Sequence, residues 1–193
     1  MSAGESAAAE KCIRHNLERL KQMGAKTVVT TCPGCYRVWK EEYRNVSSER
    51  HPFKVLHSTE LIAGLIRDNK INIKGLTENI TYHDPCDLGR NGGIFDEPRY
   101  IMQKISGLNF VELKANRKYC SCCGSGGDLL ASNQDLAMLI ARRKVEEIME
   151  TGAQAVATAC PSCIRAIHMA KASAKVKLDV VDITELVWKS MGG

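Results

Sequence analysis

Short apolar runs alternate with longer segments of helical periodicity along this chain. Residues 26–31 (KTVVTT) and 154–159 (QAVATA) are mostly small or β-branched, which is typical of buried parallel strands. Before the second run, apolar side chains recur at helical spacing at Met138, Ala141 and Val145. Strands that alternate with helices predict an α/β fold with parallel sheets and right-handed crossovers. The same patterns predict a helix over 97–106 and strands within 53–58, 79–86, 109–114 and 178–183.

Two parts of the sequence read alike. Residues 24–39 (GAKTVVTTCPGCYRVW) match residues 152–167 (GAQAVATACPSCIRAI) at an offset of 128 residues. A second similarity, at an offset of 125 residues, relates 55–66 to 180–191. Self-similarity of this kind indicates a duplicated structural unit. We therefore expect two repeated, Rossmann-like parallel-sheet units.

The first of these units is expected to be truncated. The 128-residue offset places the counterparts of Cys122 and Cys123 a few residues ahead of Met1. We therefore expect a truncated first unit over 1–75 and a complete second unit over 76–193. An upstream segment of a longer protein, or a separate polypeptide, is expected to complete the first unit.

Composition excludes several classes of protein. The 27 Lys and Arg and the 22 Asp and Glu give a net charge of +5 that is scattered along the chain. With five Tyr, three Phe and two Trp, few rings are available to stack on bases, so nucleic-acid binding is not supported. No apolar run approaches the roughly 18 residues of a membrane span, and the N-terminal residues lack the pattern of a secretory signal. Nine cysteines then indicate reduced thiols in the cytoplasm, and hence metal or redox chemistry.

The cysteines of the second unit are arranged as metal ligands would be. Cys86, the adjacent pair Cys122 and Cys123, and the turn from Cys160 to Cys163 each follow a predicted strand. Ligands of open parallel sheets gather at the carboxyl ends of the strands. Tetrahedral zinc is usually held by paired Cys-x-x-Cys turns, whereas adjacent thiolates suit a multi-iron cluster, because neighbours can bind different irons. The pattern favours an iron–sulfur cluster and leaves zinc open as the alternative.

These motifs also carry a family resemblance. HDPC (83–86), CCG (122–124) and ACPSC (159–163), in this order and spacing, resemble the cysteine-rich CCG domain of heterodisulfide reductase. The same domain occurs in the iron–sulfur subunits of glycolate and lactate oxidases. The resemblance implies an oxidoreductase subunit with a noncubane [4Fe-4S] cluster, which receives electrons from a partner redox subunit and cleaves a disulfide or relays the electrons. It implies as ligands Cys86, Cys122, Cys123, Cys160 and Cys163.

Other residues near these motifs are weaker candidates. Many relatives place His or an aromatic residue where this chain has Asp87, so a proton donor at that place would be absent. We expect Cys120 to be a spare buried thiol rather than a sixth ligand. Cys12 aligns with Ile140, an apolar helix position, and is therefore expected to be buried. Three glycines, 124, 126 and 127, are expected to let the backbone approach the cluster closely.

Several polar residues leave two interpretations open. His83 either packs in the core or orients a ligand, and Asp84 either caps the loop or does the same. For Arg90 and Arg99, solvated surface charge is favoured over attraction of an anionic substrate. No partner pattern accompanies His15, His51, His57 or His168.

Two further functions compete with the iron–sulfur oxidoreductase. One is a zinc-stabilised module that helps to assemble a larger complex. The other is a metal-free thiol oxidoreductase that uses the Cys-Pro-Gly-Cys turn at Cys32 and Cys35. For this turn, we rank a redox pair below a half-site for a metal cluster, because the twin of the turn lies within the cluster motif. By themselves, Cys32 and Cys35 are half a site, since two thiolates do not hold a cluster.

Overall fold

All of the strands in the described part of the chain pair in parallel, in two separate sheets. The computed structural model describes residues 5–43 and 53–193, so His51 lies outside the described residues. A two-stranded sheet has the order β1-β2 and a four-stranded sheet has the order β4-β3-β5-β6. The predicted α/β class with parallel sheets is therefore confirmed. The strands are β1 (Thr27–Thr30), β2 (Lys54–His57), β3 (Glu78–His83), β4 (Leu108–Val111), β5 (Ala155–Thr158) and β6 (Asp179–Asp182).

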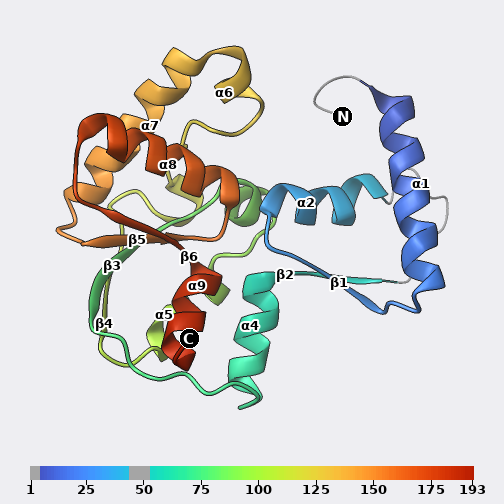
Figure 1. Cartoon of the computed structure of the whole chain (residues 1–193), viewed down its shortest axis with the longest axis horizontal. Helices are drawn as coiled ribbons and strands as arrows, with labels where there is room; N and C mark the ends of the chain where they lie inside the picture. Colours follow the sequence, from blue (N-terminus) through green and yellow to red (C-terminus); the bar gives the residue numbers. More distant parts are fainter. Residues whose placement is uncertain (1–4, 44–52) are drawn as a thin grey trace.

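Helices cover both faces of the four-stranded sheet. In Figure 1, α7 and α8 lie on one side of this sheet, and α5 and α9 lie on the other. The helices are α1 (Ser6–Gln22), α2 (Pro33–Arg37), α4 (Ser58–Arg67), α5 (Asp96–Lys104), α6 (Leu129–Ser132), α7 (Gln134–Met149), α8 (Pro161–Ala174) and α9 (Ile183–Met191). Short turns of other helical types are η1 (Val38–Glu42), η2 (Asp87–Asn91) and η3 (Arg117–Tyr119). Among the residues with described positions, no helix is both long and apolar enough to cross a membrane.

The sequence repeat is a repeat of strand register. Val28 of β1 pairs with Val55 of β2, and their counterparts Val156 and Val180 pair in the same way between β5 and β6. Each first strand leads into a helix with Pro at its start, where the missing N–H has no intrahelical acceptor to lose. The two units thus share one local plan.

One apolar core joins the two units. Tyr36 and Val55 of the first unit pack in the same buried cluster as Ile80, Tyr82 and Leu186 of the second. Burial of these apolar side chains is the main term that holds the sheets together. The division of the chain at residues 75 and 76 stays a prediction.

The prediction for Cys12 is wrong. Cys12 is exposed on α1, while Ile13 and Leu17 form the buried stripe of this helix. Their repeat counterparts Ala141 and Val145 are buried on α7, but Ile140, the counterpart of Cys12, is only half-buried. The prediction takes Ile140 as a core-facing position of α7 because it is apolar, but Ile140 does not lie on the buried side of that helix.

Candidate metal centre

The five predicted ligand cysteines lie beyond the carboxyl ends of the strands. Cys86 is three residues past the end of β3 and precedes the turn η2, and Cys160 precedes α8. Cys163 lies in the first turn of α8, while Cys122 and Cys123 lie in the loop between η3 and α6. This is the edge at which parallel sheets gather their ligands.

Four of these five cysteines line one small cavity. Cys86, Cys123, Cys160 and Cys163 surround a volume of about 200 Å³. Cys122 is exposed and is absent from this lining, but it directly precedes Cys123 in the same loop. The structure therefore brings all five thiols into one connected group.

Hydrogen bonds among the thiols make their acidities unequal. Hydrogen bonds with Cys122 and Cys163 lower the pKa of Cys123, and the same contacts raise the pKa of Cys122 and Cys163. The pKa of Cys160 is lowered to about 7, first by a hydrogen bond with the Cys163 side chain and then by the backbone N–H groups of Ser162 and Cys163. Burial opposes this shift. Metal ligation requires thiolates, so part of this group is already prepared for a cation.

Cys86 differs from the thiols of the α8 turn. Burial and the neighbouring carboxylate of Asp87 raise the pKa of Cys86. The carboxylate of Asp87 also lies 3.6 Å from the guanidinium of Arg37 in the first unit, and it accepts a hydrogen bond from Asn91 at 2.7 Å. Asp87 thus links the two units at the rim of the cavity.

His83 and Cys120 form a buried pair behind the cavity. The Nδ1 atom of His83 lies 3.4 Å from the sulfur of Cys120, and both side chains are buried. Burial alone would lower the pKa of His83, but hydrogen bonds with Cys120 and Cys123 raise it to about 9. Burial would likewise raise the pKa of Cys120, but His83 and Lys144 lower it. The expected burial of Cys120 is confirmed, and a ring nitrogen of His83 lies within 4.8 Å of the sulfurs of Cys123 and Cys163.

Arg99 is a buried structural residue, so the favoured expectation of a solvated side chain is wrong. Its guanidinium forms two hydrogen bonds with the carboxylate of Asp84, at 2.8 and 2.9 Å, and two more with Glu112. Asp84 also accepts the backbone N–H of Arg117 at 2.7 Å, so it holds the loop that follows β4. This network fixes the segment from β3 to Cys86 against the loop that follows β4.

Arg90 holds the loop that carries the cysteine pair. Its side chain is exposed and donates hydrogen bonds to the carbonyl oxygens of Cys120, at 2.7 Å, and Lys118, at 3.4 Å. The expectation that Arg90 is at the surface is confirmed. Its guanidinium nevertheless has backbone partners, which sequence patterns do not reveal.

Cys32 lies at the same cavity as the cysteines of the second unit. It lines the cavity together with Gly34, whereas Cys35 is exposed. Burial, followed by the neighbouring Cys32 and then Cys160, raises the pKa of Cys35. The sequence pattern predicts only a half-site at this turn. It does not reveal that Cys32 shares the cavity, because the contact between the units carries no local sequence signal.

The donor set fits a thiophilic metal group. Sulfur ligands select zinc, copper(I) or iron–sulfur clusters rather than magnesium or calcium. The side-chain ligand atoms of His83, Cys123 and Cys163 lie within 4.8 Å of one another, and the other thiols adjoin them. Since the volume of about 200 Å³ is below the usual 300–1,000 Å³ of organic-ligand sites, a compact inorganic group suits it better.

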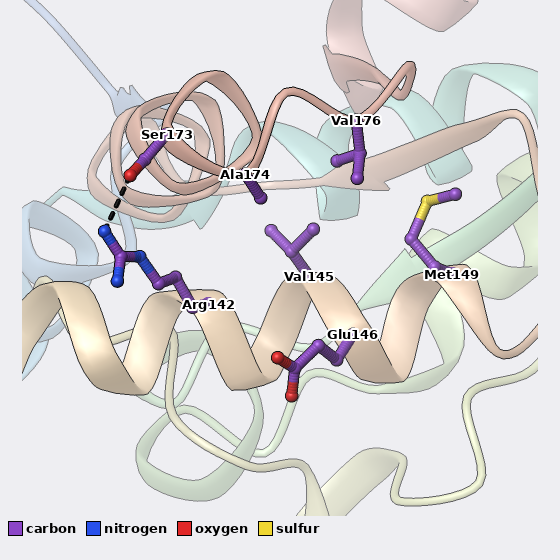
Figure 2. Close-up of a pocket in the computed structure, with 7 residues that line it drawn as sticks. All are labelled: Arg142, Val145, Glu146, Met149, Ser173, Ala174 and Val176. Atoms are coloured by element: carbon purple, nitrogen blue, oxygen red, sulfur yellow. Dashed lines mark hydrogen bonds between the residues drawn. The ribbon is translucent and has the colours of Figure 1, made fainter.

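A larger hollow lies away from the cysteines. Figure 2 shows this space between α7 and α8, with Val145, Met149 and Val176 around it. Its volume is about 490 Å³, and Arg142 donates a hydrogen bond to Ser173 at 2.7 Å across it. Its lining contains no thiol or imidazole, so it does not belong to the metal centre.

Comparison with known proteins identifies relatives over nearly the whole chain. The chain is 41% identical over 180 residues to a subunit of the dihydromethanophenazine:CoB–CoM heterodisulfide reductase of Methanosarcina mazei. That match covers 93% of this chain and 44% of the relative. The equivalent subunit of Methanosarcina barkeri is 39% identical, over 95% of this chain and 45% of its own length. The chain thus spans less than half the length of these relatives.

A more distant relative is an oxidoreductase that is not named as a heterodisulfide reductase. The EtfAB:quinone oxidoreductase of Syntrophomonas wolfei is 29% identical, over 93% of this chain and 26% of the relative. The family described as the cysteine-rich domain, CCG, matches residues 1–39 and 80–168, which hold the two Cys-Pro-x-Cys turns and all the candidate ligands. The chain therefore belongs to the cysteine-rich CCG domain family.

Proposed function

We propose that this chain binds one iron–sulfur cluster through Cys86, Cys122, Cys123, Cys160 and Cys163 and serves as the redox component of a heterodisulfide-reductase-type oxidoreductase. The observation that carries this proposal is the convergence of four of these thiols on one cavity of about 200 Å³, with the fifth, Cys122, adjacent to Cys123 in the chain. The cluster type that we propose is a noncubane [4Fe-4S] cluster. Its partners would be other redox subunits, and its location the cytoplasm.

The adjacent cysteines support a cluster over a single zinc ion. Cys122 is exposed while Cys123 is buried, so the two side chains lie in different surroundings. One tetrahedral ion takes four ligands, so it would leave one of the five thiols unused, whereas a cluster offers separate irons to adjacent cysteines. When bound, such a cluster supplies one-electron transfer and iron sites to which a substrate sulfur can bind.

The residues of the chain contribute position and shielding. The buried pair of Asp84 and Arg99 holds the segment before Cys86, and the start of α8 presents backbone N–H groups toward Cys160. His83 is buried, and a ring nitrogen of it lies within 4.8 Å of the sulfur of Cys123. Hydrogen bonds to cysteine sulfur and exclusion of solvent both change the potential of a cluster.

Relatives give this proposal its reaction class. The named relatives include heterodisulfide reductase subunits and an EtfAB:quinone oxidoreductase. Both names describe oxidation–reduction reactions, in which electrons pass from a donor to an acceptor. We propose the same role for this chain, with disulfide cleavage as the reaction and electron relay as the alternative outcome.

Anaerobic purification followed by metal analysis tests the proposal. We expect about four irons and four acid-labile sulfides per chain, together with an EPR signal that appears during redox titration. Cys123→Ser should lower the iron content, while Cys12→Ser, which changes an exposed thiol on α1 outside the cavity lining, should not. A colourless protein with one zinc and no sulfide would overturn the proposal. Thiol–disulfide activity that survives removal of metal would instead favour Cys32 and Cys35.

A further inference from the structure

A lysine ammonium group is buried beside the metal centre. The side chain of Lys144, on α7, has no solvent-exposed surface. Its Nζ atom lies 2.6 Å from a carboxylate oxygen of Glu147 and 3.8 Å from the sulfur of Cys120. Glu147 is itself partly exposed and accepts a hydrogen bond from Ser121, which precedes the cysteine pair.

The contacts of Lys144 continue to a candidate ligand. The sulfur of Cys120 lies 3.4 Å from Nδ1 of His83, and a ring nitrogen of His83 lies within 4.8 Å of the sulfur of Cys123. All four residues are buried. They form a row of neighbouring polar side chains from α7 to the cavity, which we call the Lys144 chain (Lys144, Cys120, His83 and Cys123).

The fold by itself does not require a cation at this position. Lys144 is flanked on the buried stripe of α7 by Ala141, Val145 and Ile148, so an apolar side chain would continue the stripe. Its counterpart in the repeat, 128 residues earlier, is Asn16, which is exposed on α1. Burying an ammonium group costs free energy, and pairing with a carboxylate commonly no more than offsets that cost. A buried lysine in only one of the two units indicates a role specific to that unit.

We propose that Lys144 is a positioning residue that sets the reduction potential of the cluster. Its buried ammonium group places a positive charge behind Cys123, with Cys120 and His83 between them. The inference rests on the proposed function. When the cluster accepts one electron from a reductant, its net charge falls by one and no bond within the protein forms or breaks. A cation in the poorly screened interior stabilises that added negative charge. Lys144 therefore raises the potential at which the electron is accepted.

Glu147, the carboxylate partner of Lys144, is expected to shift the reduction potential in the opposite direction. Glu147 partly compensates the ammonium charge, but its side chain is 36% exposed, so water screens it more than it screens Lys144. Removing the charge of Glu147 should raise the potential, and by less than removal of Lys144 lowers it. The pair thus offers two variants with opposite expected signs.

The test is an EPR-monitored redox titration with dithionite on the anaerobically purified chain. In Lys144→Met, which keeps the length and apolar stem of the side chain, we expect full iron content and a midpoint potential more negative than that of the wild type. In Glu147→Gln we expect a smaller shift to a more positive potential. The matched control is Arg143→Met, which removes an exposed charge from the same turn of α7 and should leave the potential unchanged.

Each outcome bears on one proposal. An unshifted potential in Lys144→Met with full iron content, or an equal shift in Arg143→Met, would overturn the role of Lys144. If Lys144→Met loses iron, its potential cannot be compared, and Glu147→Gln becomes the test. An unshifted potential in Glu147→Gln would then overturn the role of Lys144. A wild-type chain without any cluster would instead overturn the proposed function. Loss of iron in Cys120→Ser would make Cys120 a ligand and overturn its place in the Lys144 chain.

Discussion

Gly124 lies so close to α7 that a Cβ atom on it would be 2.4 Å from the carbonyl oxygen of Ala137. The same glycine has φ of +85°, in the region that side chains rarely adopt. Its N–H group donates a hydrogen bond to the sulfur of Cys122 at 3.3 Å. Glycine is therefore needed here because the cysteine loop packs on a helix. Gly126 differs, since a Cβ atom there would meet open space.

We expect Gly124→Ala to disrupt the cysteine loop. The clash with backbone and the strained φ should together cost at least about 2 kcal/mol of unfolding free energy, and the displaced Cys122 and Cys123 should lower the iron content. Gly126→Ala is the matched control and should retain both iron and stability. Denaturant unfolding and iron analysis measure the two effects. Equal behaviour of the two variants would contradict the packing argument.

The ion pair of Asp84 and Arg99 predicts a second large effect. Both side chains are almost fully buried, at 3% and 4% exposure, so Arg99→Met leaves a buried carboxylate without its cation. Such a loss typically costs about 3–5 kcal/mol, and here it should also loosen the segment before Cys86. Thermal or denaturant unfolding under anaerobic conditions measures it.

The control for this variant is another arginine in the same region. Arg117 pairs with Asp96 at 2.7 Å, but both side chains are well exposed. Arg117→Met should therefore cost less than about 1 kcal/mol, and it keeps the backbone N–H that Asp84 accepts. If Arg99→Met were as mild as Arg117→Met, the buried pair would not hold the loop.

Much of the fold could be predicted because it depends on local patterns and on the repeat. The runs around Val28 and Val156 are strands, and the repeat that aligns them also aligns their parallel partners. The positions of Cys86 and Cys160 after strands followed from the same pattern. Parallel pairing then places such residues at one edge of the sheet.

The parts that could not be predicted depend on contacts between distant segments. Arg99 and Lys144 carry charges that sequence patterns assign to the surface, and their partners are known only once the chain is folded. Cys32 reaches the cavity through packing of one unit against the other. The prediction for Cys12 was wrong for a simpler reason, because one residue along a helix turns a side chain by about 100°.

The repeat supplies a matched pair of cysteines for testing the ligand set. Cys163 is buried and lines the cavity, while its counterpart Cys35 is exposed and is absent from the cavity lining. Cys163→Ser should remove most of the iron and lower the stability, because bound metal contributes folding free energy. Cys35→Ser should retain one cluster per chain. Iron loss in Cys35→Ser, or two clusters in the wild type, would contradict a single site in the second unit.

His57 predicts a dependence of stability on pH that does not involve the metal centre. His57 is fully buried, and its Nδ1 atom accepts the backbone N–H of Thr59 at the start of α4, with Glu60 completing a reciprocal cap. Burial lowers the pKa of His57 from 6.5 to about 4. Between these two values the unfolded chain binds more protons than the folded chain. Stability from the neutral ring is therefore complete above pH 6.5 and is lost as the pH falls toward 4.

The size of this effect follows from the shift. It reaches about 3 kcal/mol once the pH is below both pKa values, and a large part is lost by about pH 5. His57→Asn keeps an acceptor for Thr59 and removes the titrating ring, so its denaturant midpoint should fall less than that of the wild type between about pH 7 and pH 5. His168→Asn, a change at an exposed position on α8, should follow the wild type. In the second unit, Asp182 stands at the position equivalent to His57. It caps α9 by accepting the N–H of Thr184 at 2.8 Å, so this effect of a capping histidine belongs to the first unit. An NMR titration in which the His57 ring protonates above about pH 6 would contradict the prediction.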